Sequence, residues 1–242
     1  MATALLETDA IHTYRGAAHV LQGVSLAVRP EQVVCLVGRN GAGKTTTIDS
    51  IMGLLAVRQG HVTFQGRDIT RLAAYERARL GIGYAPEDAG IFPDLTVAEN
   101  FLIAQGLAEA AGKGGAAGTA ATRERVFALF PEVRNLLGRR GLNLSGGQKK
   151  MVAIARAITL APSVLLLDEP FEGLAPVVVN RFIDAVKRIK EMGVSLLIAE
   201  SNLATASRIA DRLYAIDRGE IIFQGDPGSA LANAEVMKTL RG

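Results

Sequence analysis

The sequence predicts an α/β fold with a mainly parallel core sheet that helices cover on both faces. Short apolar runs, such as Val33–Val37 and Ser163–Leu167, have the composition of buried strands. Segments with helical patterns follow most of these runs, and alternating strands and helices are typical of parallel sheets. Hydrophobic residues make up 49% of the 242 residues and charged residues 21%, which is enough apolar material for a substantial core.

The first part of the chain is expected to be rich in strands. Residues 3 to about 37 carry three apolar segments, and a glycine-rich turn after the third leads into a helix. The elements expected up to residue 84 are strands at Leu5–Ile11, Val20–Val28 and Val33–Val37, a helix that ends near Gly53, a strand and turn at Val62–Gly66, a helix at Arg71–Leu80 and a strand at Ile82–Tyr84.

Between residues 94 and 142 the sequence changes character, and we expect a helical insertion between two halves of the core. Thr96 and Glu99 form a capping-box pattern at the start of a helix. Residues 110–121 are almost all Ala, Gly and Thr, which favours a flexible loop. Residues 123–130 resume a helix, which stops before a proline.

The rest of the chain returns to alternating helices and strands. We expect helices at 146–160, 177–192 and 203–210 and strands at 163–167, 194–199, 213–216 and 221–223. We therefore interpret residues 1–242 as a single domain, with a helical subdomain at roughly 94–160 inserted in the core.

Composition excludes several classes of protein. The net charge is only +3, Trp is absent and aromatic residues are 5%, so neither a strongly basic surface nor a base-stacking platform is indicated. The single cysteine, Cys35, lies in an apolar strand and is expected to be a core residue in a reducing compartment. We expect no signal peptide, because the N-terminal segment lacks a basic start and a long apolar core. We expect no transmembrane span, because the sequence has no uncharged apolar run long enough to cross a bilayer.

A phosphate-binding loop follows the strand Val33–Val37. The segment from Gly38 fits the pattern G-x-x-x-x-G-K-[ST] between a strand and a helix, which is the context that this loop requires. Its glycines allow backbone N–H groups to surround an anion, Lys44 offers a charge to the β- and γ-phosphates, and Thr45 offers its hydroxyl to Mg²⁺. The alternative is a chance glycine-rich turn. The residues expected to contact the nucleotide here are Gly38, Arg39, Asn40, Gly41, Ala42, Gly43, Lys44, Thr45 and Thr46.

Two acidic residues end a later apolar strand. Asp168 and Glu169 follow Val164–Leu167, and ligands of parallel sheets lie outside the carboxyl ends of the strands. We expect Asp168 to hold Mg²⁺ and Glu169 to orient and deprotonate the attacking water. The alternative is an acidic strand end before a turn at Pro170.

A third motif, Leu144-Ser145-Gly146-Gly147-Gln148, opens a helix. Ser145 can cap the helix and Gln148 completes a capping box, so a well-formed helix start is one interpretation. However, Gly146 and Gly147 in the first turn cost roughly 1 kcal/mol each relative to alanine. This cost suggests that something approaches the backbone closely, and a helix N-terminus is a favourable site for phosphate.

The three motifs, in this order and at this spacing, resemble those of the ATP-binding-cassette (ABC) ATPases, and the resemblance covers nearly the whole chain. It implies an ABC-type P-loop NTPase fold with an N-terminal antiparallel β-subdomain and a helical insertion. It also implies ATP and Mg²⁺ as bound cofactors, and hydrolysis of ATP to ADP and phosphate as the reaction.

The resemblance further implies a head-to-tail dimer with a second ABC ATPase subunit, either identical or paralogous. In such a dimer Ser145, Gly146, Gly147 and Gln148 of one subunit close on the ATP held by the other subunit. Tyr14 matches the aromatic residue that stacks on adenine, a contact worth roughly 1–3 kcal/mol, although a core or surface role is also compatible with its position.

Two positions depart from the usual family pattern. Glu87 stands where a glutamine usually contacts Mg²⁺ and the attacking water, and Ser201 stands where a histidine usually contacts the γ-phosphate. Glu87 can still bind Mg²⁺, whereas Ser201 cannot carry a positive charge. We expect both to lie in the catalytic site with Glu169. The alternatives are loop drift with activity preserved and a regulatory subunit with weak catalysis.

These departures, with Gly173-Leu174-Ala175-Pro176, resemble the ATPase subunits of branched-chain amino-acid importers. The resemblance implies a cytoplasmic subunit, peripheral on the inner face of the membrane, that works with integral permease subunits and indirectly with an extracytoplasmic solute-binding protein. No nucleic-acid partner is expected. The alternatives are urea or amide import, lipopolysaccharide export and an ABC-type nucleotide switch outside transport.

Overall fold

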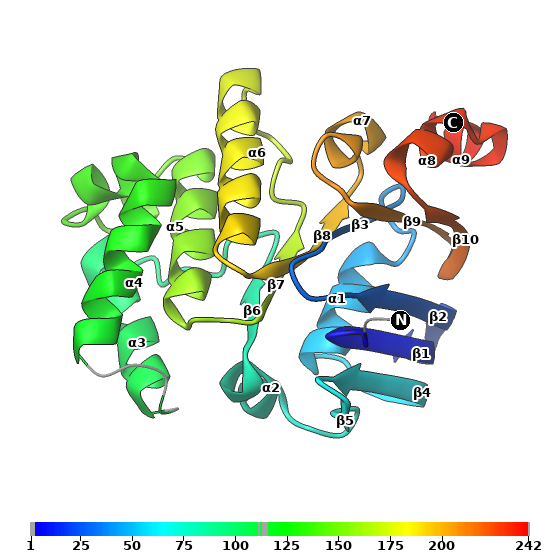
Figure 1. The fold of residues 1–242 in the computed structure, drawn as a ribbon, viewed down its shortest axis with the longest axis horizontal. Coiled ribbons are helices and arrows are strands. Elements are labelled where there is room, and N and C mark those ends of the chain that lie inside the picture. The colour runs from blue at the N-terminus through cyan, green and yellow to red at the C-terminus, as the bar shows by residue number, and fades with distance from the viewer. Residues whose placement is uncertain (1–2, 111, 113–115, 242) are drawn as a thin grey trace.

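The computed structural model describes residues 3–110, 112 and 116–241, which form two β-sheets and the helices that pack against them (Figure 1). The larger sheet consists of β3 (Val33–Val37), β6 (Ile82–Ala85), β7 (Val164–Asp168), β8 (Ser195–Glu200), β9 (Arg212–Asp217) and β10 (Glu220–Gly225). Its spatial order is β10-β9-β3-β8-β7-β6. All pairs are parallel except β10 with β9 at the edge. The predicted fold class is therefore confirmed.

The smaller sheet is antiparallel and confirms the N-terminal β-subdomain. It consists of β1 (Leu6–Arg15), β2 (Ala18–Val28), β4 (Val57–Phe64) and β5 (Arg67–Asp68), in the order β2-β1-β4-β5. The prediction ended the first strand at Ile11, but β1 continues to Arg15, so Tyr14 lies inside a strand. Thr13 explains the extension, because its buried hydroxyl lies 2.9 Å from that of Ser50 beneath the sheet.

The central strand β3 is buried on both faces, as its unbroken apolar sequence predicted. On one face of the larger sheet, Cys35 belongs to a hydrophobic cluster formed with the helices that cover that face. On the other face, Leu36 belongs to a hydrophobic cluster between the two sheets. Burial raises the pKa of the Cys35 thiol well above its usual range, so this side chain is an inert core residue as expected. The helix α1 (Lys44–Met52) follows β3 and lies against both sheets.

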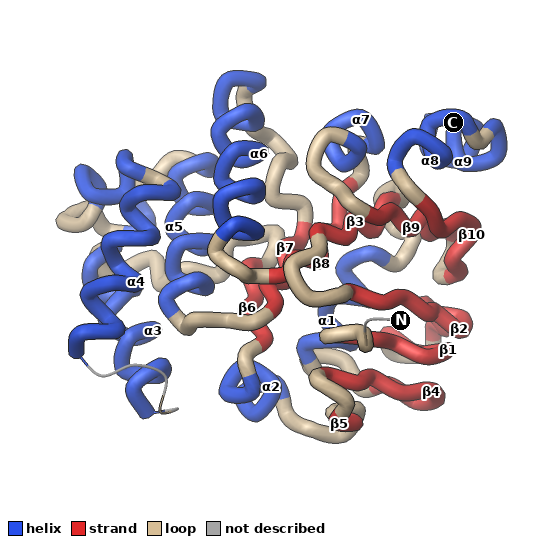
Figure 2. Tube along the Cα trace, viewed as in Figure 1, coloured by secondary structure: helices blue, strands red, loops and turns tan. Residues whose placement is uncertain are grey.

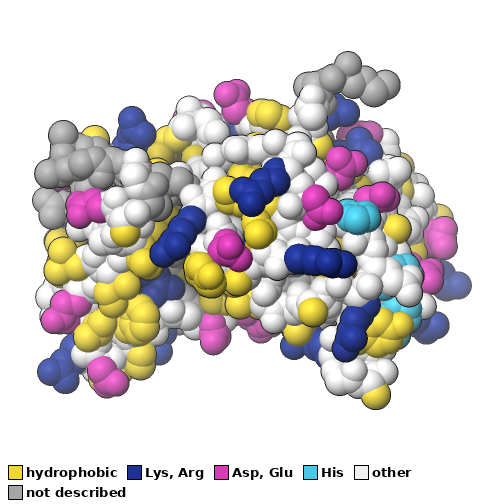
Figure 3. Space-filling view, turned by 90° about the horizontal axis from the view of Figure 1, so that it is seen from below, with side chains coloured by type: hydrophobic (Ala, Val, Ile, Leu, Met, Phe, Trp, Pro, Cys, Tyr) yellow, Lys and Arg dark blue, Asp and Glu magenta, His cyan; other side chains and the backbone are white. Residues whose placement is uncertain are grey.

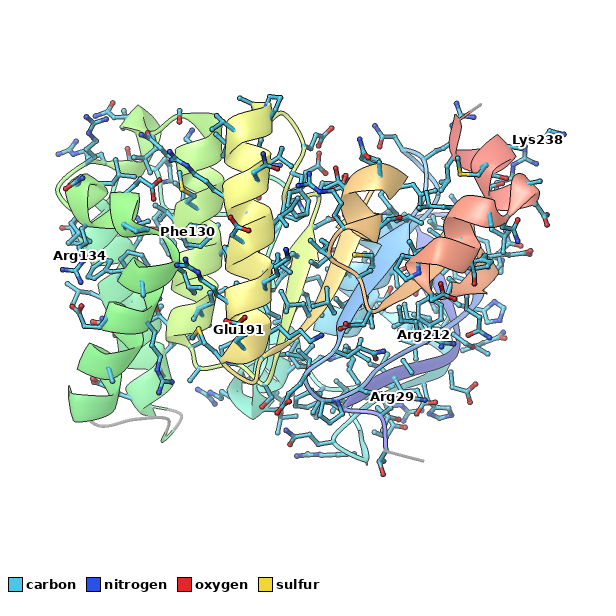
Figure 4. The ribbon with its side chains drawn as sticks, turned by 45° about the horizontal axis from the view of Figure 1, so that its top comes forward. Arg29, Phe130, Arg134, Glu191, Arg212 and Lys238 are labelled. Carbon is cyan, nitrogen blue, oxygen red and sulfur yellow. The ribbon has the colours of Figure 1, made fainter. Side chains whose placement is uncertain are left out.

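A block of helices separates β6 from β7, and Figure 2 shows only helix and loop there among the residues described. It contains α3 (Val97–Ala110), α4 (Ala116–Leu129), the short 3-10 helices η1 (Pro131–Leu136) and η2 (Gly141–Asn143), and α5 (Gly146–Thr159). The capping box of Thr96 and Glu99 is confirmed, with the Thr96 N–H 2.7 Å from the Glu99 carboxylate. Phe130, labelled in Figure 4, packs its ring against Phe182 of α6 (Pro176–Glu191).

The loop predicted at 110–121 is wrong at Ala110, which ends α3, and over residues 116–121, which form the first turns of α4. Alanine has the highest helix propensity, and α4 packs against α5 and η1, so these gains outweigh the glycine at position 118. Residues 111 and 113–115 of that segment lie outside the residues described. The insertion itself is confirmed as helical, while its standing as a subdomain of one domain remains a prediction.

In the part of the chain that the structure describes, four further short helices lie outside the helical insertion. The remaining helices are α2 (Ala74–Leu80), α7 (Leu203–Ser207), α8 (Pro227–Ala232) and α9 (Ala234–Arg241). The sequence analysis did not identify α8 or α9, although Asp226 caps α8 by accepting a hydrogen bond from the Ser229 N–H at 3.0 Å. Figure 4 places Lys238 of α9 at the outer end of the molecule. Across the described parts of the chain, no helix combines the length and the apolar character needed to cross a membrane.

Candidate functional site

The loop between β3 and α1 has the conformation that its glycines permit. Gly41 and Gly43 have φ angles of 82° and 115°, in the region that side chains disfavour. Gly38 has a different reason to be glycine, because a Cβ there would lie 2.6 Å from the carbonyl oxygen of Ile216 on β9. The loop therefore fits closely against the core sheet and leads directly into the N-terminus of α1, a favourable position for an anion.

Lys44, the first residue of α1, is 4% exposed and has three partners for its ammonium group. Its Nζ donates hydrogen bonds to the carbonyl oxygens of Gly38 at 2.8 Å and Arg39 at 3.1 Å. It also forms an ion pair with Glu169, with 2.9 Å between Nζ and Oε1. The structure thus joins two predicted site residues that are far apart in the sequence.

Glu169 lies directly after β7 and is 4% exposed. Its φ angle is 45°, which is uncommon for a residue with a side chain. While Oε1 contacts Lys44, Oε2 accepts hydrogen bonds from the backbone N–H of Ser201 at 3.1 Å and from its hydroxyl at 3.2 Å. Both carboxylate oxygens are therefore bound, and Ser201 lies beside the carboxylate in the site where the sequence analysis expected it.

Asp168 ends β7 and is the candidate cation ligand. Its side chain is 2% exposed, and neither carboxylate oxygen accepts a well-formed hydrogen bond from the residues that the structure describes. Burial raises its pKa to about 6, an effect that the hydroxyl of Thr45 partly opposes. A buried carboxylate without a protein donor, next to a hydroxyl, fits a hard cation such as Mg²⁺, which prefers oxygen ligands.

Glu87 lies in the loop after β6, and its side chain is exposed to solvent. Its carboxyl pKa is raised, first by partial burial and then by the nearby carboxylates of Glu172 and Glu169. It also contributes to the raised pKa of Asp168, so it acts on the same site electrostatically. The structure thus brings Glu87 near the other two acidic residues.

The motif Ser145–Gln148 begins α5 and has the predicted capping box. The Ser145 N–H donates to Gln148 Oε1 at 3.0 Å, and the Gln148 N–H donates to the Ser145 hydroxyl at 3.4 Å. A Cβ at Gly147 would lie 3.2 Å from Leu174, whereas nothing lies within 4 Å of a Cβ at Gly146. Within the described chain, the residues of this motif make no hydrogen bond to the phosphate-binding loop.

Tyr14 is 36% exposed and stacks against His19, its cross-strand partner on β2. The two ring centroids are 4.3 Å apart and the rings are nearly parallel, at 5°. The next residue, Arg15, ties this end of β1 to α1. Its Nε donates to the Thr46 hydroxyl at 3.1 Å, and it pairs with Asp49 at 2.7 Å. These contacts hold Tyr14 close to the start of α1.

The sequence analysis missed His19, Lys150 and Glu200. His19 could have been found from the pairing of β1 with β2, once Tyr14 had been assigned to a strand. Glu200 is 2% exposed, and burial raises its pKa to about 7. Its Oε1 accepts hydrogen bonds from the backbone N–H groups of Ser201 and Asn202, whereas Oε2 has no partner among the described residues.

Comparison with known proteins places this site in a family. The family model described as ABC transporter matches residues 21–172. The chain is 37% identical over 229 residues to a probable ABC transporter ATP-binding protein of Azorhizobium caulinodans, covering 94% of this chain and 79% of that protein.

Relatives with more specific names are nearly as similar. The high-affinity branched-chain amino acid transport ATP-binding protein BraG of Pseudomonas aeruginosa is 30% identical, covering 98% of this chain and 100% of BraG. The lipopolysaccharide export system ATP-binding protein LptB of Escherichia coli K12 is 33% identical, covering 95% of this chain and 93% of LptB. These two relatives carry different substrates in their names.

Solved structures agree with the fold. A nucleotide-free ATP-binding cassette from an ABC transporter superposes with a TM-score of 0.85 at 28% identity, covering 99% of this chain and all of that chain. The ADP conformation of MJ1267, an ATP-binding cassette of an ABC transporter, has a TM-score of 0.83 at 29% identity and covers 99% of both chains.

Proposed function

We propose that this chain, which belongs to the ABC transporter family of ATP-binding proteins, uses ATP hydrolysis to energise import of branched-chain amino acids or a similar small polar solute. The observation that carries the catalytic part is the buried contact of Lys44 with Glu169 at the end of β7. This contact joins the residue that would hold the phosphates to the residue that would act on water.

Lys44 would bind the β- and γ-phosphates of ATP, with the backbone N–H groups of the loop around it. Because phosphate oxygens offer Lys44 a new anionic partner, Glu169 would be released to orient and deprotonate the attacking water. Thr45, Asp168 and Glu87 would hold Mg²⁺, which neutralises charge on the phosphates. Tyr14 would stack on adenine.

Gly146 supports a head-to-tail dimer. A glycine at this position costs helix stability, yet nothing in the described chain lies close enough to require it. A surface outside this chain explains the glycine, and ATP held by a second ATPase subunit is the ligand that a helix N-terminus favours. Each ATP would then lie between one subunit's phosphate-binding loop and the other subunit's motif Ser145–Gln148.

A groove between α2 and α3 supports a permease partner. It has a volume of about 290 Å³, and its lining includes Met52, Tyr75, Leu107 and Leu160. Tyr75 and Leu107 are 63% and 56% exposed, and Figure 3 shows hydrophobic side chains gathered on this underside of the molecule. An amphipathic helix of a membrane permease would bury this apolar surface. The subunit would then work at the inner face of the membrane.

Branched-chain amino acids are the solute that the resemblance at Glu87 and Ser201 favours, and BraG has such a transport role in its name. Lipopolysaccharide export is the second candidate, because LptB is similarly related. Amino-acid import and lipopolysaccharide export differ in the direction of transport and in the substrate, so one experiment can separate these two functions.

The proposal can be tested with Glu169→Gln in the chromosomal copy of the source organism, with the exposed Lys187→Met as a matched control. We expect Glu169→Gln to abolish uptake of labelled leucine and the purified variant to lose about 10²–10⁴-fold in ATP turnover. Normal leucine uptake with a loss of surface lipopolysaccharide would indicate export. If both processes were normal while turnover fell, the chain would instead energise import of another solute, such as urea or an amide, or act as a nucleotide switch outside transport.

A further inference from the structure

Lys150 links two parts of the site that the motifs do not connect. It lies on α5, shortly after the motif Ser145–Gln148, and its side chain is half-buried. Its Nζ donates hydrogen bonds to the backbone carbonyl oxygens of Glu169 at 2.5 Å and Glu172 at 3.0 Å. Both acceptors belong to the turn that follows β7.

Four carboxylates act electrostatically on the ammonium group of Lys150. Partial burial lowers its pKa, while the negative charges of Glu172, Glu169, Glu200 and Glu87 oppose that effect in this order. Lys150 therefore balances a cluster of acidic residues. A lysine spends side-chain entropy when it is fixed at such a site, so these contacts must offset that cost.

The turn that Lys150 holds has an unfavourable backbone conformation. Glu169 has a φ angle of 45°, which is an unfavourable region for a residue with a side chain. This φ angle determines where the Glu169 side chain leaves the backbone, and hence where its carboxylate lies. A donor on the Glu169 carbonyl restrains the same peptide group.

We propose that Lys150 is a positioning residue for ATP hydrolysis. By binding the carbonyl oxygens of Glu169 and Glu172, it fixes the turn that directs the Glu169 carboxylate, and it connects this turn to the helix that begins with Ser145–Gln148. The inference rests on the proposed role of Glu169 as the general base. Lys150 contacts backbone atoms rather than reacting atoms, so it acts through Glu169.

This connection has a consequence for the proposed dimer. The N-terminus of α5 would contact ATP bound to the partner subunit, whereas Glu169 would act on ATP bound to its own subunit. Lys150 connects α5 directly to the turn at Glu169. A displacement of α5 on dimer closure would therefore move this turn as well.

The test compares Lys150→Met with Lys187→Met, which removes an exposed lysine on α6. We expect Lys150→Met to lower kcat about tenfold or more, because small misplacements of a catalytic group are costly, and to leave KM and the Kd for MgATP within about twofold. Lys150→Arg, which retains charge and donors, should recover most of the rate. Lys187→Met should behave as the wild type. A loss of MgATP affinity with normal kcat would overturn the proposal.

A second measurement separates positioning from general damage. If Lys150 acts through Glu169, adding Lys150→Met to Glu169→Gln should cause little further loss of turnover. A further tenfold loss in that background, or a Lys150→Met rate equal to that of Lys187→Met, would overturn the inference. Unchanged turnover in Glu169→Gln alone would instead refute the proposed role of Glu169.

Should Lys150→Met not fold, Lys150→Gln replaces it, because the shorter amide retains one pair of donors. We expect an intermediate loss of kcat with unchanged MgATP affinity. A folded Lys150→Gln protein with wild-type kcat and a wild-type response to Glu169→Gln would count against the proposal.

Discussion

Replacing Lys44 by methionine should destabilise the nucleotide-free protein more than replacing Lys44 and Glu169 together. The two charged groups are 2.9 Å apart, and their side chains are 4% and 6% exposed. At an effective dielectric constant of about 20, this distance corresponds to an attraction of about 6 kcal/mol. Burial of each ion costs several kcal/mol, so the complete pair contributes little net stability.

Removing one partner has a different effect, because it leaves a buried charge without compensation, at a cost of about 3–5 kcal/mol. In Lys44→Met the Glu169 carboxylate retains the two donors of Ser201, so we expect the lower end, about 3 kcal/mol. The further change Glu169→Gln removes the charge and retains an acceptor for Ser201. The double variant should therefore lose only about 1 kcal/mol.

Urea unfolding of the wild type, both single variants and the double variant, without nucleotide or Mg²⁺, measures the free energy of unfolding of each. Lys190→Met is the control, because Lys190 pairs with Asp211 where both side chains are more than a third exposed and solvent screens the contact. Its loss should be within about 1 kcal/mol of zero. If the single costs simply added in the double variant, the Lys44–Glu169 pair would not exist in solution.

Two further predictions concern the residues at the end of β8. Ser201→His should keep or raise the rate of ATP turnover and introduce a pH dependence near about 6.5, because an imidazolium would stabilise charge on the γ-phosphate. A steady-state rate and pH profile identical to the wild type would show that residue 201 does not face the phosphate. Glu200 has a raised pKa of about 7, so its contribution to stability is complete below about 4.5 and is lost as the pH rises through 7. The wild type should therefore lose at most about 3 kcal/mol of its free energy of unfolding over that range, and Glu200→Gln should not show this loss. Urea unfolding at pH 5 and pH 8 measures both proteins, and the same pH dependence in both would contradict this reasoning.

The buried strands could be predicted because their sequences have only one favourable environment. Every residue of β3 and β7 is buried, and no polar side chain interrupts either strand before its functional end. The segment at 116–121 could not be predicted, because its composition suits both a loop and a helix. Packing of α4 on α5 decides between the two, and that contact depends on tertiary structure.

In the candidate site, too, the residues could be predicted from local sequence, whereas the contacts between them could not. Lys44, Asp168 and Glu169 could be identified because each occupies a fixed place in a local motif. Their contacts depend on the strand order β3-β8-β7, which brings the ends of three strands together. No local pattern contains that order, so the pairing of Lys44 with Glu169 could not be predicted.

Ser201 shows what strand order adds to the chemistry of the site. The sequence analysis considered this residue only as a poor substitute for a histidine that faces the γ-phosphate. In the structure, its N–H and hydroxyl both bind the Glu169 carboxylate, so it stabilises the proposed base with two neutral donors. These donors do not titrate near neutral pH, whereas a histidine would. The serine side chain therefore gives the Glu169 carboxylate a neutral donor, which is compatible with an active ATPase.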